Sequence, residues 1–209
     1  AMVLSGNKET AYIDTYTKDV QNYIVYNKSS LRTSRTWSCM VEDEAEATSV
    51  VSGRSTNESL ASDGQFRTYR LAMACTIEYA AYHITAAGIA AAAPLATKKA
   101  AVLAAMNVTM TRLNGVYERD MSLRMQLVAN NDLIIFVTSD TFTNDDANSL
   151  INESQTVIDA NIGAANYDIG HTVSTGGGGL AQSPSVCVAG SKARGITGSP
   201  APVGDPFDI

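Results

Sequence analysis

Histidine and cysteine, the residues that most often carry catalysis or bind metals, are few in this 209-residue chain. The two histidines are His83 and His171, and the three cysteines are Cys39, Cys75 and Cys187. A catalytic zinc ion commonly needs three protein ligands, and a serine triad needs a histidine beside its nucleophile. Neither histidine belongs to an H-E-x-x-H motif or adjoins a G-x-S-x-G elbow. No active site is complete within the chain, and we interpret both histidines as hydrogen-bonded structural residues.

A run of four glycines, residues 176–179, is the second feature with chemical meaning. It does not match a phosphate-binding loop, because the following LAQSP is not helical. Glycines in a strand let another backbone approach closely. Followed by Leu180 and Ala181, the run is typical of an exposed edge strand to which an extended peptide adds by main-chain hydrogen bonds. A loop without any ligand has the same composition, so both interpretations stay open.

Three neighbouring aspartates, Asp140, Asp145 and Asp146, form a further cluster of candidate ligands. They lack the alternating spacing of a calcium-binding loop. We therefore interpret them as turn and helix-capping residues rather than as cation ligands.

Composition restricts the classes of partner. The net charge of −6 argues against nucleic acid or an anionic membrane surface as the partner. The longest apolar run, AAGIAAAAPL at residues 86–95, is too short to span a bilayer and is interrupted by Pro94. The hydrophobic fraction of 45% is ordinary for a globular core.

Residues 1–65 differ in pattern from the remainder. Short alternating runs of Tyr, Ile and Val in residues 11–30 predict a strand or a hairpin. The stretch from Cys39 to Gln65 is first acidic and then rich in Ser and Gly, which is typical of a linker. We expect a domain boundary near Gln65.

From Phe66 onward the pattern predicts an α/β domain. Tyr69, Leu71, Met73 and Cys75 alternate as in a half-buried strand. Apolar residues at three- and four-residue steps predict helices over residues 98–121 and 149–162, the second closed by Gly163. Further strand-like segments are residues 123–127, residues 133–137 and both ends of residues 167–190.

These segments resemble a known family. The stretch NYDIGHTVSTGGGGLAQSPSVCVAGSKARGITGSPAPVGDPFDI is similar to the segment before the zinc motif in bacterial reprolysin-like zinc metallopeptidases of the metzincin clan. FRTYRLAMACTIEYAAY and MNVTMTRLNGVYERDMSLRMQLVANNDLIIF resemble earlier parts of the same catalytic domain. The resemblance covers about residues 66–209.

The resemblance implies an α/β fold, the upper catalytic subdomain of a metzincin. It would contain a twisted, mostly parallel sheet with an antiparallel edge strand and two long helices, preceded by a prodomain tail in residues 1–65. It implies that Gly178, Gly179, Leu180 and Ala181 contact a peptide substrate. It also implies that zinc is held by an H-E-x-x-H-x-x-G-x-x-H segment, which residues 1–209 lack. We expect that the chain stops just before the zinc-binding helix and that it binds no zinc by itself.

The resemblance also suggests roles for the cysteines. Cys39 is loosely similar to the latency cysteine that caps zinc in related zymogens, although Met40 follows it where glycine is usual. Cys75 and Cys187 would then be available to form a disulfide.

The leading interpretation is the N-terminal portion of a secreted or periplasmic zinc metalloendopeptidase, inactive by itself. The main alternative is a non-catalytic peptide-binding or inhibitory module that keeps the fold and the glycine edge. The missing helix would leave apolar surface uncovered, so self-association is a further expectation. An unrelated α/β enzyme that uses His83 and His171 would need both near a common nucleophile.

Overall fold

The computed structural model describes residues 2–5, 8–15, 21–30, 64–204 and 207. The described amino-terminal part is a three-stranded antiparallel sheet in the order β1-β2-β3. The strands are β1 (Met2–Ser5), β2 (Lys8–Thr15) and β3 (Tyr23–Asn27), followed by the 3-10 turn η1 (Lys28–Ser30). The hairpin predicted within residues 11–30 is confirmed by the pairing of β2 with β3.

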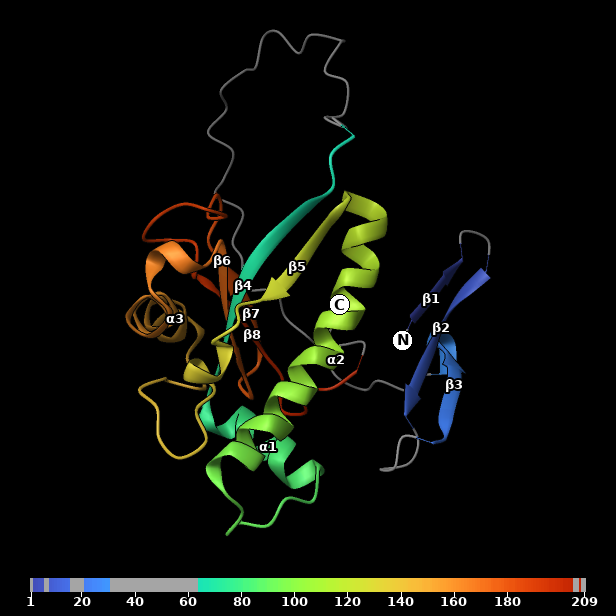
Figure 1. Cartoon of the computed structure of the whole chain (residues 1–209), viewed down its shortest axis with the longest axis horizontal. Coiled ribbons are helices and arrows are strands. Elements are labelled where there is room, and N and C mark those ends of the chain that lie inside the picture. The colour runs from blue at the N-terminus through green and yellow to red at the C-terminus, as the bar shows by residue number, and fades with distance from the viewer. Residues whose placement is uncertain (1, 6–7, 16–20, 31–63, 205–206, 208–209) are drawn as a thin grey trace, which may run out of the picture.

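The main domain is built on a five-stranded sheet in the order β5-β4-β6-β8-β7 (Figure 1). Its strands are β4 (Arg67–Cys75), β5 (Leu123–Leu127), β6 (Ile169–Ser174), β7 (Gly178–Ala181) and β8 (Gly195–Gly198). Four strands run parallel and β7 runs antiparallel to β8 at one edge. The helices are α1 (Ile77–Ala86), α2 (Leu95–Met121) and α3 (Ala147–Ile162), and the 3-10 turns are η2 (Asn131–Ile134) and η3 (Ala164–Asn166).

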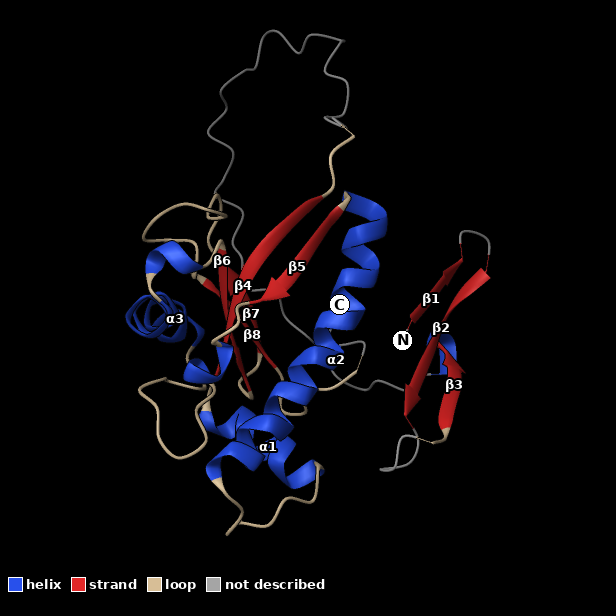
Figure 2. Ribbon diagram, in the orientation of Figure 1, coloured by secondary structure: helices blue, strands red, loops and turns tan. Residues whose placement is uncertain are grey.

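Helices cover both faces of this sheet (Figure 2). On one face Leu71, Met73 and Cys75 of β4 pack in a core cluster with residues of α1 and α2. On the other face Ala72 and Ala74 pack in a cluster with residues of α3. The predicted half-buried strand is therefore buried on both faces over residues 71–75, because small alanines alternate with the larger side chains and let α3 lie close. No helix in the described part of the chain is both long enough and apolar enough to span a membrane.

Local signals explain where the two long helices begin and end. α2 begins at Leu95, directly after Pro94, and ends at Met121, where the C-cap residue Ser122 has a left-handed φ of 52°. α3 is capped by Asp146, whose side chain accepts a hydrogen bond from the Asn148 amide, and ends at Ile162, before the C-cap residue Gly163 with φ of 84°. Both predicted helices are confirmed within a few residues. The shorter α1 was not predicted.

Two further segments differ from the sequence prediction. The strand expected over residues 133–137 is wrong: the chain forms the turn η2, and only Ile135 bridges to Cys75. The reason is Asn131, whose side chain pairs with the Met73 amide and carbonyl of β4. These main-chain groups would otherwise bond to a neighbouring strand. The strand β8 was not predicted, because its sequence GITG has only one large apolar residue.

The candidate disulfide between Cys75 and Cys187 is not formed, and both thiols are free. Cys75 ends β4 opposite Val173, whereas the Cys187 amide donates to the Asp168 carbonyl just before β6. Five residues of strand separate these two levels, roughly 16 Å at the usual strand rise, which is too far for a disulfide. Burial raises the pKa of the Cys75 thiol to about 12. Cys39 lies outside the described residues.

Candidate functional site

The glycine-rich strand β7 forms the outer edge of the main sheet, next to β8. Its register pairs Gly178 with Gly198, Leu180 with Ile196 and Ala181 with Gly195. The Gln182 amide just beyond donates to the Arg194 carbonyl at 2.9 Å. In an antiparallel pair, hydrogen-bonded residues recur at every second position. Leu180 and Gly178 therefore bond to β8, and the main-chain groups of Gly179 and Ala181 are turned away from it. Ala181 is exposed there, whereas Gly179 is buried.

The side chains of this edge follow the same alternation. Leu180 packs in a cluster with Leu150, Ile151 and Ile196, between the sheet and α3. The main chain of Leu180 is therefore paired with β8, and its side chain is packed in the core, so neither is available to a ligand. Of the four residues predicted to contact a peptide, only Ala181 is both turned away from β8 and exposed, as addition of a strand requires.

The bend before β7 requires glycine because of its tight packing. A Cβ at Gly176 would lie 2.4 Å from the Asn144 carbonyl oxygen, and one at Gly198 would lie 2.3 Å from the Gly176 carbonyl oxygen. A Cβ at Gly177 would meet nothing within 4 Å. The glycine run therefore serves two purposes. At Gly176 the backbone lies in close contact with the backbone of Asn144, whereas a side chain at Gly177 would have room.

Asn144 ties this bend to the carboxyl ends of β4 and β6. Its side-chain oxygen accepts hydrogen bonds from the Thr76 hydroxyl at 2.8 Å and from the Thr175 amide at 3.1 Å. Its side-chain nitrogen lies 3.0 Å from the Thr175 hydroxyl oxygen. Sequence reasoning did not find Asn144, and its place beside three aspartates gave no distinguishing signal.

The aspartates near this bend have structural roles. The Asp140 carboxylate accepts from the Ile77 amide at 2.7 Å and from the Phe142 amide at 3.0 Å, so it holds the start of α1. Asp146 caps α3, and hydrogen bonds from Ser149 and Asn148 keep its pKa below the ordinary value. The Asp145 carboxylate accepts from the side-chain nitrogen Nδ2 of Asn144 at 2.7 Å. The prediction of turn and capping residues is confirmed for Asp140 and Asp146.

His83 lies within α1 and is buried between aromatic rings. Its ring centroid is 4.4 Å from that of Tyr79 and 5.2 Å from that of Tyr82. The nitrogen Nε2 has no hydrogen-bond partner, although a hydrogen bond links the ring to the Pro202 backbone. Loss of water around the ring lowers the pKa of His83 to about 4, so the imidazole is neutral at pH 7.

His171 lies on β6, where Nε2 is 2.9 Å from the Thr197 hydroxyl oxygen. Loss of water around it also lowers its pKa to about 4. The neighbours of His171 and His83 differ, and no nucleophile shared by the two is found in the described part of the chain. The interpretation of both as structural histidines is therefore favoured over an enzyme that uses the pair.

Acid should destabilise the protein through these neutral histidines. The unfolded chain binds their protons near pH 6.5, whereas the folded protein does so only near pH 4. The free energy of unfolding should therefore fall as pH falls from 7 to 5, by about 2 kcal/mol for His83 alone. We expect His83→Gln to reduce this fall, measured by urea unfolding at each pH, with His171→Gln as the matched comparison. An unchanged slope in the His83 variant would contradict the assignment.

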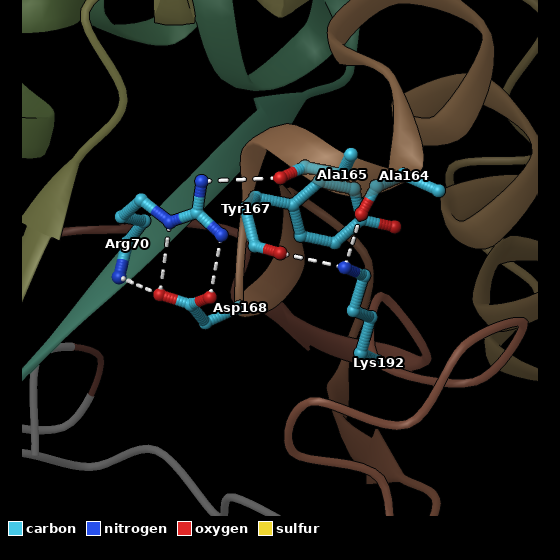
Figure 3. A network of polar contacts seen from close by, with 6 residues as sticks. All are labelled: Arg70, Ala164, Ala165, Tyr167, Asp168 and Lys192. Atoms are coloured by element: carbon cyan, nitrogen blue, oxygen red, sulfur yellow. Dashed lines mark hydrogen bonds and ion pairs between the residues drawn. The ribbon is translucent and has the colours of Figure 1, made fainter.

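A polar network holds the opposite end of the sheet (Figure 3). The Arg70 guanidinium donates to both Asp168 carboxylate oxygens, at 2.7 and 3.1 Å, and to the Ala165 carbonyl at 3.1 Å. These bonds lower the pKa of Asp168. The Lys192 ammonium donates to the Ala164 and Tyr167 carbonyls. The network joins β4, the start of β6 and the segment before β8, so it fixes the strands that carry the edge.

The described residues do not fit a zinc site. No group of three or more His, Cys, Asp or Glu side chains that could hold a metal ion occurs among residues 2–5, 8–15, 21–30, 64–204 and 207. His171 is bonded to Thr197, and the nearest aromatic neighbours of His83 are two tyrosines. No hydrolytic step can be assigned to these residues.

A mostly parallel sheet with an antiparallel edge strand and helices on both faces is consistent with the catalytic domain of a metzincin. A sequence model of the metallo-peptidase family M12B, reprolysin-like, matches residues 103–208, about half of the chain. The chain belongs to this family of zinc-dependent proteases, whose members are typically extracellular. The comparison with curated proteins found no match.

Proposed function

We propose that the chain is the amino-terminal portion of a secreted zinc metalloendopeptidase, in which residues 66–209 bind the substrate and residues 1–65 form the end of a propeptide. The observation that carries this proposal is the edge strand β7, antiparallel to β8 in an otherwise parallel sheet. Family membership supports peptide-bond hydrolysis as the reaction.

The substrate in this proposal is a peptide in an extended conformation. It adds to the outer edge of β7 at Ala181, which is exposed and whose main-chain groups are turned away from β8. Gly179 has the same orientation but is buried, so in this proposal a bound peptide pairs with Gly179 only after the groups that cover it move. Backbone recognition accepts many sequences, which suits an endopeptidase, and side-chain preference would then come from pockets beside the edge.

The zinc ligands and the general base lie, in this proposal, outside residues 1–209, since these contain no H-E-x-x-H motif. In the family, zinc activates the attacking water and a glutamate acts as general base. Residues 1–209 would contribute the binding edge and the sheet that supports it.

The test is an assay of fluorescent casein with the purified 209-residue chain, with added zinc and with EDTA in parallel. We expect no cleavage that zinc increases or EDTA abolishes, because no ligand set is present. Cleavage insensitive to EDTA would indicate a contaminating protease. Robust EDTA-sensitive cleavage would overturn the proposal that the zinc ligands lie outside residues 1–209.

A second candidate is a non-catalytic peptide-binding or inhibitory module. It is favoured by the β7 edge strand, exposed at Ala181, together with the lack of a metal-binding group in the described residues. The gene beyond the codon for Ile209 separates the two candidates. A frame that continues into H-E-x-x-H-x-x-G-x-x-H, with EDTA-sensitive cleavage by the longer product, supports the protease, whereas a stop codon supports the module.

The two candidates also differ in solution behaviour. A stand-alone module should be a monodisperse monomer, whereas part of a larger enzyme should self-associate through apolar surface that the remainder would cover. Size-exclusion chromatography with light scattering at several protein concentrations measures this difference.

A further inference from the structure

The side chain of Arg112, on α2, is buried against the amino-terminal sheet. Only 5% of its side chain is exposed, and its Nη2 lies 2.7 Å from the Asp14 carboxylate on β2. A guanidinium keeps its charge when buried, so it requires a charged or polar partner. That partner comes from a segment 98 positions away in sequence.

Aromatic residues of the same sheet complete the contact. The Tyr26 hydroxyl donates to Asp14 at 2.5 Å, and its oxygen is 3.4 Å from Arg112 Nη2. The Arg112 guanidinium carbon lies 5.1 Å from the Tyr12 ring centroid, a cation–π distance. Tyr12 is directly opposite Tyr26 in the register of β2 and β3, so these residues belong to one face of the sheet.

The packing around this anchor is incomplete. A cavity of about 420 Å³ lies between the sheet and the main domain. Ile13 and Tyr23 line it from the sheet, Val108 from α2, and Pro202 and Val203 from the segment after β8. A contact that leaves such a space depends more on its charged anchor than on a close-packed apolar interface.

Two observations indicate that the sheet is a separable body. Strands β1, β2 and β3 form a sheet distinct from the five-stranded one, so no ladder of strand hydrogen bonds joins the two. The segment from residue 31 to 63 connects them through a sequence rich in acidic residues, Ser and Gly.

We propose that the face of α2 around Arg112 is a docking surface for the β1–β3 sheet, which binds it as a non-covalent partner anchored by Asp14 and the tyrosines Tyr12 and Tyr26. The sheet remains bound when the chain is cut between residues 31 and 63. The partner chemistry is a β-sheet face that presents one carboxylate flanked by tyrosines.

The test uses the full chain with a site-specific protease sequence inserted between residues 31 and 63. After cleavage, the fraction of the amino-terminal fragment that co-elutes with the main domain is measured over a dilution series to give a dissociation constant. We expect co-elution for the wild type, and a dissociation constant roughly tenfold higher or more for Arg112→Met. Separation of the wild-type fragments after cleavage would overturn the proposal.

Asp14→Asn removes the charge from the other side and leaves α2 unaltered, so it remains informative if Arg112→Met fails to fold. Arg119→Met is the matched control, because Arg119 is also on α2 but is 51% exposed and pairs with Asp120. We expect the double variant of Asp14 and Arg112 to be little weaker than either single one, since both remove one interaction. Equal weakening by Arg119→Met and Arg112→Met, or additive effects of the two anchor variants, would show that Arg112 is not the anchor.

Discussion

Replacement of Gly176 by alanine is expected to lower the free energy of unfolding by about 3 kcal/mol, the upper end of the usual cost of overpacking. The new Cβ would lie 2.4 Å from the Asn144 carbonyl oxygen, closer than two such atoms can approach. The Asn144 segment cannot move away easily, because hydrogen bonds from Thr76 and Thr175 hold the Asn144 side chain. The bend before β7 would have to shift, and the edge strand with it.

The neighbouring glycine provides a matched control. A Cβ at Gly177 would meet nothing within 4 Å, and its φ is not in the left-handed region. We therefore expect Gly177→Ala to leave stability unchanged or to raise it by up to about 1 kcal/mol through the unfolded chain. Urea unfolding of both variants measures the difference. Equal stability of the two would show that Gly176 is not in close contact with the Asn144 segment.

Asn131→Ala is the second substitution with a large expected effect. The Asn131 side chain accepts from the Met73 amide at 2.8 Å and donates to the Met73 carbonyl at 2.9 Å. Asn131 is only 2% exposed and Met73 3%, so water cannot replace the lost partner. Two buried main-chain groups would be left unpaired, and we expect a loss of about 3 kcal/mol.

Asn130→Ala is the control for this experiment. Asn130 precedes Asn131 in the chain, is exposed, and makes no capping hydrogen bond with its side chain. It should change the free energy of unfolding by less than about 0.5 kcal/mol. Thermal and urea unfolding of the two variants, side by side, tests the assignment, and similar losses at both positions would contradict it.

The Asn131 contact also explains one failed prediction from the sequence. The apolar run from Leu133 to Val137 has the composition of a strand, but main-chain pairing with β4 is limited there to the bridge between Ile135 and Cys75. An amide side chain can replace a neighbouring strand only when the fold brings it there. Sequence spacing contains no record of such a contact.

The sequence by itself determined the elements with strong local signals. The stripe of Val102, Met106 and Met110 predicted α2, Gly163 marked the end of α3, and alternation predicted β4 and β5. The glycine run was compatible with an edge strand or with a loop, and the structure shows that its second half belongs to the edge strand β7. These features depend on residues within a few positions of one another, so local patterns are sufficient to show them.

Only the tertiary structure decided what depends on distant residues. It separated Cys75 from Cys187 along the sheet, buried β4 on both faces and turned the main-chain groups of Gly179 and Ala181 away from β8, with only Ala181 exposed. It also placed the Arg112 guanidinium against Asp14. Each of these results follows from strand order, register or packing between segments far apart in the chain, and a local sequence pattern contains none of that information.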